Sequence, residues 1–156
     1  MVRVRFQPGL VMRIPLEDGM HTYGRMLQAS PYVAFHDFRT TDEEPDLSKV
    51  VASPVLFVLA SGAVRSLENG EWKSVGKVLL SEVDTPIPLQ FMQNIGNIND
   101  MSVMDHLGNR RAATFEECEN LERASVWQAE HVEERLNDHY AGRENQEVRR
   151  GRIKKP

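Results

Sequence analysis

The stretch LVMRIPLEDGMHTYGRMLQASPYVAFHDF, residues 10–38, decides the fold. Its apolar residues fall into three short runs, Leu10 to Ile14, Met20 to Leu27 and Tyr32 to Phe38, which turn residues separate. Pro15 ends the first run or places it at a sheet edge, because proline has no amide hydrogen for a central ladder. We therefore predict three successive strands of an antiparallel sheet.

Strand signals continue beyond this stretch. The run Val55 to Leu59 is apolar throughout, as expected for a strand buried on both faces, and Ala63 to Leu67 predicts a helical turn. An Asn-Gly turn before Trp72 predicts a further strand, and Met101 to Met104 predicts a short last one. Gly24, inside the second run, indicates a bulge or a close approach of backbone.

The final third of the chain is helical in pattern. Thr114 and Glu117 match a capping box, which predicts a helix start, and apolar residues then recur every three positions to Ala124. After a slip in register, Ala129 to Tyr140 predicts a second helix that stops at Gly142. We predict an α+β fold, with a twisted or partly closed antiparallel β-sheet and a C-terminal helical segment packed on it.

Length and composition indicate one domain. The chain has 156 residues, of which 40% are hydrophobic and 27% charged, as in ordinary globular proteins. We expect a single domain over residues 1–142 and a basic, flexible tail over residues 143–156. The single cysteine, Cys118, favours a reducing compartment, and no run is long enough to span a bilayer. The N-terminus lacks the apolar core of a signal peptide, so we expect a cytoplasmic protein without membrane contact.

Acidic residues gather in two places. The loop from Thr40 to Asp46 carries four acids, a proline and no large apolar residue. The stretch from Thr114 to Asp138 carries eight acids against two arginines, and the acids are Glu116, Glu117, Glu119, Glu122, Glu130, Glu133, Glu134 and Asp138. Such surfaces attract a basic partner, although a solvated helix face is the ordinary explanation for any one glutamate.

Catalytic and ligand-binding patterns are absent from the sequence. His36 adjoins Asp37 and His106 adjoins Asp105, but neighbours on a strand point to opposite faces. His131 and Glu134 share a helix face without a metalloprotease or di-iron motif, and the scattered glycines form no phosphate loop. Cys118 fits a small buried hydrophobe better than a reactive thiolate. We predict no catalytic, cofactor-binding or metal site.

Several ordered motifs resemble the immunity protein 26 family of bacterial polymorphic toxin systems. They are the strand, Asp-Gly turn and Tyr-Gly pair in RIPLEDGMHTYG, the W-x-x-V-G element from Trp72 to Gly76, and LERASVW from Leu121 to Trp127. The resemblance implies a protein that inhibits a cognate toxin by binding and that has no enzyme activity. It supplies no catalytic residues, and the recurrent aromatics and glycines have structural explanations as core anchors and turn formers.

The acidic segments are the predicted partner-binding surface. Its residues are Asp42, Glu43, Glu44, Asp46, Glu130, Glu133 and Glu134, whose charges complement a basic toxin surface. Two alternatives remain, a small metal-dependent hydrolase that uses His36, His106 or His131, and a nucleic-acid-associated protein that uses the basic tail. The tail lacks interleaved aromatic residues, so we expect no nucleic-acid partner, and the sequence leaves self-association open.

Overall fold

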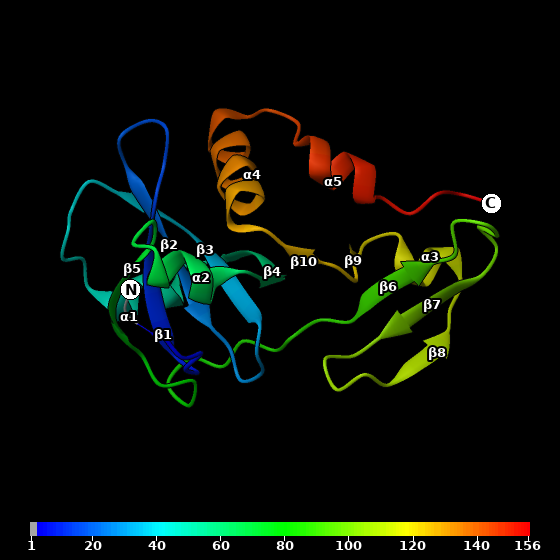
Figure 1. The fold of residues 1–156 in the computed structure, drawn as a ribbon, viewed down its shortest axis with the longest axis horizontal. Coiled ribbons are helices and arrows are strands. Elements are labelled where there is room, and N and C mark those ends of the chain that lie inside the picture. The colour runs from blue at the N-terminus through cyan, green and yellow to red at the C-terminus, as the bar shows by residue number, and fades with distance from the viewer. Residues whose placement is uncertain (1–2) are drawn as a thin grey trace. The chain divides into compact units, whose positions relative to one another are not determined.

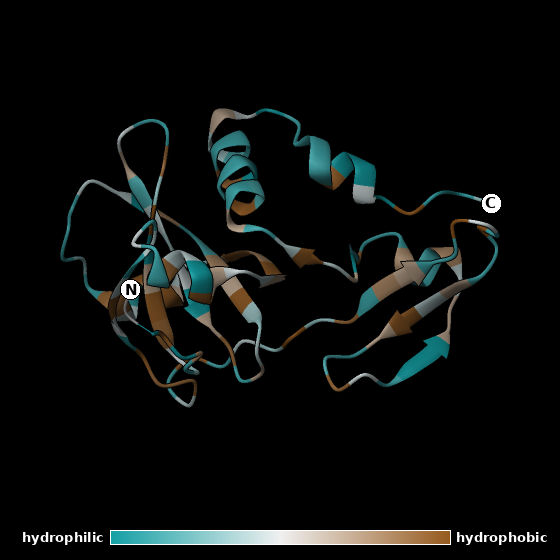
Figure 2. Ribbon diagram, viewed as in Figure 1, coloured by the Kyte–Doolittle hydropathy of each residue, from teal (hydrophilic) through white to brown (hydrophobic). Residues whose placement is uncertain are grey.

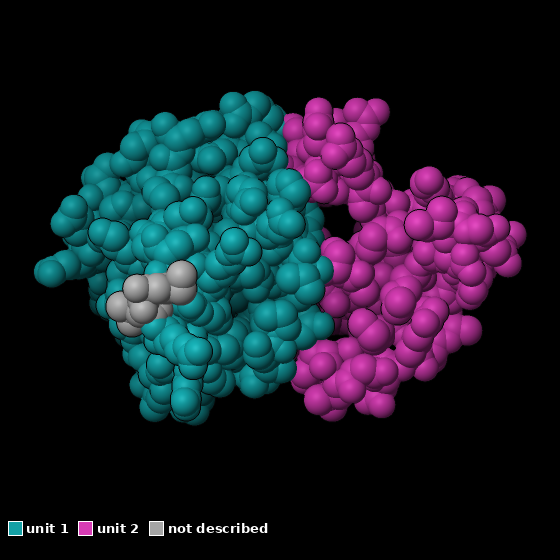
Figure 3. All heavy atoms as spheres, in the orientation of Figure 1, with its two compact units in different colours: residues 1–86, 126–143 teal, residues 87–125, 144–156 magenta. Residues whose placement is uncertain are grey.

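The three predicted strands form the middle of a six-stranded sheet in the computed structural model, which describes residues 3–156 (Figure 1). This sheet belongs to unit 1, residues 1–86 and 126–143, and a second sheet belongs to unit 2, residues 87–125 and 144–156 (Figure 3). The strand order in unit 1 is β10-β4-β3-β2-β1-β5. The strands are β1 (Leu10–Pro15), β2 (His21–Met26), β3 (Tyr32–Thr40), β4 (Val55–Ser61), β5 (Lys73–Lys77) and β10 (Val126–Trp127).

The register of the central strands explains Gly24. It pairs with Met12 on β1 and with Phe35 on β3. A Cβ atom at Gly24 would lie 3.0 Å from a Val33 methyl and 3.2 Å from the Phe35 ring. Of the two predicted alternatives, a close approach is therefore the one the structure contains at this glycine.

Both faces of the sheet in unit 1 are covered. Helices α2 (Ala63–Glu68) and α4 (Ala129–Ala141) cover one face, and α1 (Leu47–Ala52) with the segment around Val78 and Val83 covers the other. The first core includes Met12, Ile14, Met26, Val33, Phe35, Leu59, Trp72, Val132 and Leu136. The second includes Val11, Tyr23, Val50, Val51 and Val78. In Figure 2, α4 is largely hydrophilic, as expected for a helix with one buried stripe.

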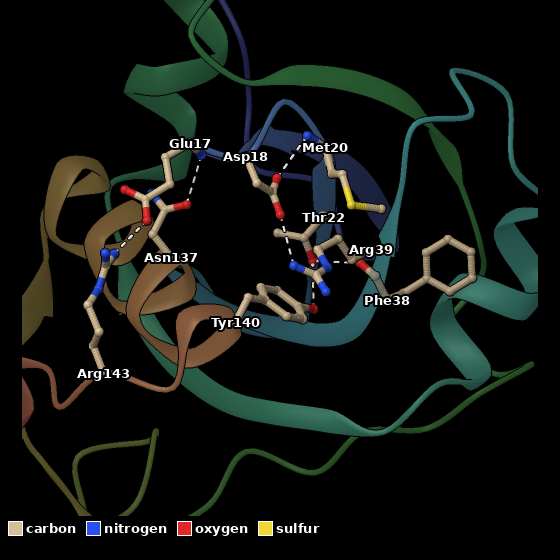
Figure 4. Close-up of polar contacts among 9 residues, drawn as sticks. All are labelled: Glu17, Asp18, Met20, Thr22, Phe38, Arg39, Asn137, Tyr140 and Arg143. Carbon is tan, nitrogen blue, oxygen red and sulfur yellow. Dashed lines mark hydrogen bonds and ion pairs between the residues drawn. The ribbon is translucent and has the colours of Figure 1, made fainter.

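Polar contacts hold the C-terminal end of α4 against the β1–β2 turn and β3 (Figure 4). The Glu17 amide donates to Asn137 Oδ1 at 2.9 Å, and Arg143 bridges Glu17 and Asp138. The Arg39 guanidinium lies 4.6 Å from the centroid of the Tyr140 ring. These contacts are exposed or half-buried, so their main effect is to orient the helix end.

Unit 2 contains a four-stranded sheet of order β8-β7-β6-β9. Its elements are β6 (Gln90–Gln93), β7 (Met101–Met104), β8 (Arg110–Ala112), β9 (Glu122–Arg123), α3 (Phe115–Cys118) and α5 (Gln146–Gly151). Phe91, Met101, Val103 and Cys118 are its buried core, and Ile153 packs against them. Gln93 exchanges two hydrogen bonds with the backbone of Lys154.

The α+β class is confirmed, with two open sheets that are mostly antiparallel. The capping box at Thr114 and the helix that ends at Gly142 are also confirmed, and Gly142 is left-handed with φ 70°. The helix predicted to continue to Ala124 is wrong, because α3 ends after one turn and β9 follows. The prediction that Met101 to Met104 is the last strand is wrong as well, because β8, β9 and β10 follow it.

The single domain over residues 1–142 and the flexible tail over residues 143–156 stay predictions. Gly142 is the C-cap of α4. Within the tail, Asn145 is the N-cap of α5, and its side chain accepts a hydrogen bond from the Val148 amide.

Gly9 and Gly19 form a matched pair for testing the packing of the segment at Val78. Both have positive φ, 92° and 84°, but a Cβ at Gly9 would lie 2.6 Å from the Val78 carbonyl oxygen, whereas a Cβ at Gly19 would meet nothing within 4 Å. We expect Gly19→Ala to lower the free energy of unfolding by about 1–2 kcal/mol, the cost of a left-handed alanine. Gly9→Ala adds a clash with backbone and should cost about 1–3 kcal/mol more in urea unfolding. Equal losses would contradict this packing.

Candidate partner-binding surface

The four predicted loop acids are all exposed, but they differ in what their side chains do. Asp42 Oδ1 accepts from the Glu44 amide at 2.9 Å, and Asp46 Oδ1 accepts from the Ser48 amide at 3.0 Å as the N-cap of α1. Both aspartates therefore shape the loop. Glu43 and Glu44 are different. Within residues 3–156, their exposed carboxylates take part in no hydrogen bond or ion pair.

The three predicted acids of α4 also divide. Glu130 and Glu134 are exposed and lie four residues apart, on one side of the helix. Glu133 is half-buried, and its Oε1 accepts a hydrogen bond from Trp72 Nε1 at 2.7 Å. Trp72 is 1% exposed, so its indole N–H needs this acceptor. Glu133 is thus an anchor for the core tryptophan rather than a freely exposed charge.

Burial raises the pKa of the Glu133 carboxyl above its ordinary value. The hydrogen bond from Trp72 opposes this shift, while the nearby carboxylates of Glu71 and Glu130 add to it. The negative charges of Glu71 and Glu130 therefore act on the Glu133 carboxylate near the start of α4. This repulsion makes a positively charged partner favourable at this place.

Glu71 connects the two predicted acidic segments. It lines a hollow of about 370 Å³ between α2 and the start of α4, to which Glu130 also contributes. It also lines a second hollow of about 290 Å³, to which Glu43 contributes. Glu71 thus lines both hollows, and the sequence analysis missed this residue. The sequence did contain a signal for this residue, because Glu71 lies directly between the Asn-Gly turn and the buried Trp72.

Positive charges interrupt this surface. Arg65 lines the first hollow, and Arg13 and Lys73 line the second. A partner must therefore match a mixed pattern rather than a uniform negative field, and such patterns favour specificity as well as fast association.

An arginine between two aromatic rings lies on the same helix. The Arg135 guanidinium is 3.9 Å from the centroid of Phe57 and 5.0 Å from that of Trp127. These contacts join α4 to β4 and β10, so they stabilise the helix against the sheet. The sequence analysis did not identify this cluster, because its members are far apart in the chain.

The histidines of the hydrolase alternative lie in different settings. His36 is fully buried, with Nδ1 at 3.1 Å from the Ser53 carbonyl oxygen, and burial lowers its pKa. His106 belongs to unit 2 and His131 to unit 1. Among residues 3–156, no three histidine, cysteine or acidic side chains are grouped as metal ligands. Cys118 is buried, and burial raises the pKa of its thiol, which disfavours the reactive thiolate.

A comparison with models of known protein families identifies the family of this chain. The model described as immunity protein 26 matches residues 7–102, more than half of the chain. The chain belongs to the immunity protein 26 family. A search of curated proteins and a search of solved structures found no match. Across residues 3–156, no helix combines the length and apolar composition needed to cross a bilayer.

The immunity protein 26 match covers two of the three motifs on which the resemblance rests. It includes β1, β2 and the element from Trp72 to Gly76, and the segment Leu121–Trp127 lies beyond it. Ile14, Tyr23 and Trp72 are almost fully buried, and Gly19 has φ 84° in a turn. These motif residues therefore build the core and turns, and one of the predicted surface acids, Glu133, is hydrogen-bonded to the motif residue Trp72.

Two substitutions separate the two roles of Glu133. Glu133→Ala leaves the Trp72 N–H without its acceptor and should lower the free energy of unfolding by about 1–3 kcal/mol. Glu133→Gln keeps an acceptor oxygen and should retain most of that stability. The exposed Glu134→Ala is the matched control, with an expected change within about 0.5 kcal/mol.

The raised pKa of Glu133 also predicts a pH dependence. A carboxyl whose folded pKa is raised contributes stability at pH values below its ordinary pKa of 4.5, and this contribution is lost as the pH rises through the folded pKa. Thermal unfolding followed from pH 4 upward should show this decline in the wild type and a smaller one in Glu133→Gln. Identical pH profiles would contradict the assignment.

Proposed function

We propose that this chain is an immunity protein that binds a cognate bacterial toxin domain and neutralises it without catalysing a reaction. The observation that carries this proposal is membership of the immunity protein 26 family. The buried setting of His36 and Cys118 agrees with inhibition by binding rather than by chemistry. In this proposal the protein acts in the cytoplasm, where it protects the producing cell.

The toxin-binding surface in this proposal is the acidic side of unit 1. Glu43, Glu44, Glu130 and Glu134 supply exposed carboxylates, and Glu71 links the loop to the helix. Asp42, Asp46 and Glu133 add negative charge to the same surface, but their side chains also hold the loop, α1 and Trp72 in place. A basic toxin surface, such as that of a nuclease, complements this arrangement.

Paired charge reversals test the location. The probe is the purified C-terminal domain encoded by the open reading frame next to this gene, in a catalytically inactive form. We expect Glu43→Lys with Glu44→Lys, and separately Glu130→Lys with Glu134→Lys, to weaken binding about tenfold or more in calorimetric titration. The loss should come mainly from slower association and should shrink as salt is added.

The matched control is Glu116→Lys with Glu119→Lys in unit 2, which changes the net charge equally at exposed positions outside the proposed surface. It should leave the affinity within about twofold, because exposed charges that make no contact with the partner are largely screened at physiological salt. If the control variant binds the probe as weakly as the two test variants, overall charge rather than this surface governs binding. Failure of the wild type to bind the probe would overturn the proposed function.

A further inference from the structure

A buried arginine in unit 1 has no role in the surface described above. Arg25 lies on β2 with 0% exposure, and its guanidinium donates to three backbone carbonyl oxygens. The acceptors are Val83 at 2.7 Å, Leu79 at 2.7 Å and Val78 at 3.0 Å. A buried charge is costly unless hydrogen bonds and nearby opposite charges compensate it. All three acceptors come from one short segment, so Arg25 determines the backbone course of that segment.

The segment held by Arg25 is a loop, residues 78–84, that follows β5. Its inner side is fixed, because Val78 and Val83 pack in the core beneath α1 and the Val78 amide donates to the Gly9 carbonyl at 2.9 Å. The Glu82 amide donates to the Leu79 carbonyl oxygen at 3.0 Å, which closes a turn within the loop. The loop thus has a defined backbone although it is neither helix nor strand.

The outer side of this loop combines an apolar side chain with acids. Leu79 is 53% exposed, and Glu82 and Asp84 are exposed. Figure 2 shows the hydrophobic stretch that follows β5. No lysine or arginine occurs from residue 78 to residue 109, so no neighbour in sequence neutralises the two acids. They act electrostatically on Arg25, and they also face solvent.

We propose that the loop of residues 78–84, held in shape by Arg25, is an anchor for the toxin domain, with Leu79 entering an apolar pocket that has a basic rim. This inference rests on the proposed function and names a second contact for it. A backbone that is already held in place lowers the ordering cost of binding. An apolar side chain that fills a pocket while polar groups around it exclude water is the arrangement of an interface hot spot. The charge of Glu82 and Asp84 selects a basic rim over an acidic one.

The loop shares a core with α1, the helix that follows the acidic loop already proposed. α1 begins directly after Asp46, and Leu47, Val50 and Val51 of that helix share the second core with Val78 and Val83. The loop of residues 42–46 and the loop of residues 78–84 therefore border the same face of the sheet. A toxin domain that lies across α1 would contact both.

Leu79→Ser tests the anchor directly. The side chain is exposed, so the substitution should leave thermal unfolding unchanged while the affinity for the inactive toxin-domain probe falls about tenfold or more. The matched control is Leu107→Ser, at a residue of unit 2 that is 75% exposed. It should change the affinity less than about twofold.

Removing the two acidic charges beside Leu79 gives a second, independent test. Glu82→Gln with Asp84→Asn should slow association several-fold at low salt and much less at high salt. Arg25→Lys keeps the charge but offers fewer donors, so hydrogen exchange of the amides of residues 79–84 should become faster while the rest of unit 1 keeps its protection. Its affinity should fall with that of Leu79→Ser.

Each outcome distinguishes the proposals. If the wild type does not bind the probe, the toxin-binding function fails and the inference fails with it. If the wild type binds and Leu79→Ser binds equally well, the anchor is wrong and the function stands. A stronger effect of Leu107→Ser than of Leu79→Ser would overturn the location. If light scattering shows the chain alone to be a dimer that Leu79→Ser dissociates, a second copy occupies the loop and the assignment to the toxin is overturned.

Discussion

Burial of β3 on both faces is the constraint on which the rest of unit 1 depends. Val33 and Phe35 point into one core and Ala34 and His36 lie on the opposite face, and all four are fully buried. A strand that is buried on both faces needs other elements packed on each face. Each apolar side chain left exposed would lose about 1.5–3 kcal/mol of burial free energy. Helices α2 and α4 cover one face, and α1 together with the loop of residues 78–84 covers the other.

The second constraint comes from polar groups inside those covers, which need hydrogen-bond partners, and within residues 3–156 the buried Arg25 Nε, His36 Nε2 and Ser61 Oγ lack one. The Trp72 N–H takes a carboxylate from α4, and the Arg25 guanidinium takes carbonyl oxygens from a loop. Each contact crosses more than fifty residues of sequence and fixes a segment that hydrophobic packing alone would leave adjustable. The acids of this chain therefore fall into two groups, those committed to the fold and those available to a partner. A surface map of charge would not separate them.

Much of the fold could be predicted because local signals agreed with it. Pro15 marked a strand end, and regular apolar spacing marked α4. α1 was missed because its N-cap, Asp46, lies in a run of acids that resembles a loop. The helix predicted after Thr114 was too long, because spacing by three also fits one turn followed by an extended segment. Arg25 could not be found, since a charged residue in a strand is ordinarily solvent-exposed and its acceptors lie over fifty residues away.

The division of unit 1 into two stretches of sequence has a consequence for synthesis. Residues 87–125, which belong to unit 2, leave the ribosome before α4 does. Until then the nascent sheet lacks Val132 and Leu136, and one of its faces stays open to water. A chain stopped by premature termination inside unit 2 would carry most of the family motifs without a closed core. Under the proposed function, the chain would bind its toxin only after α4 has left the ribosome and packed on the sheet.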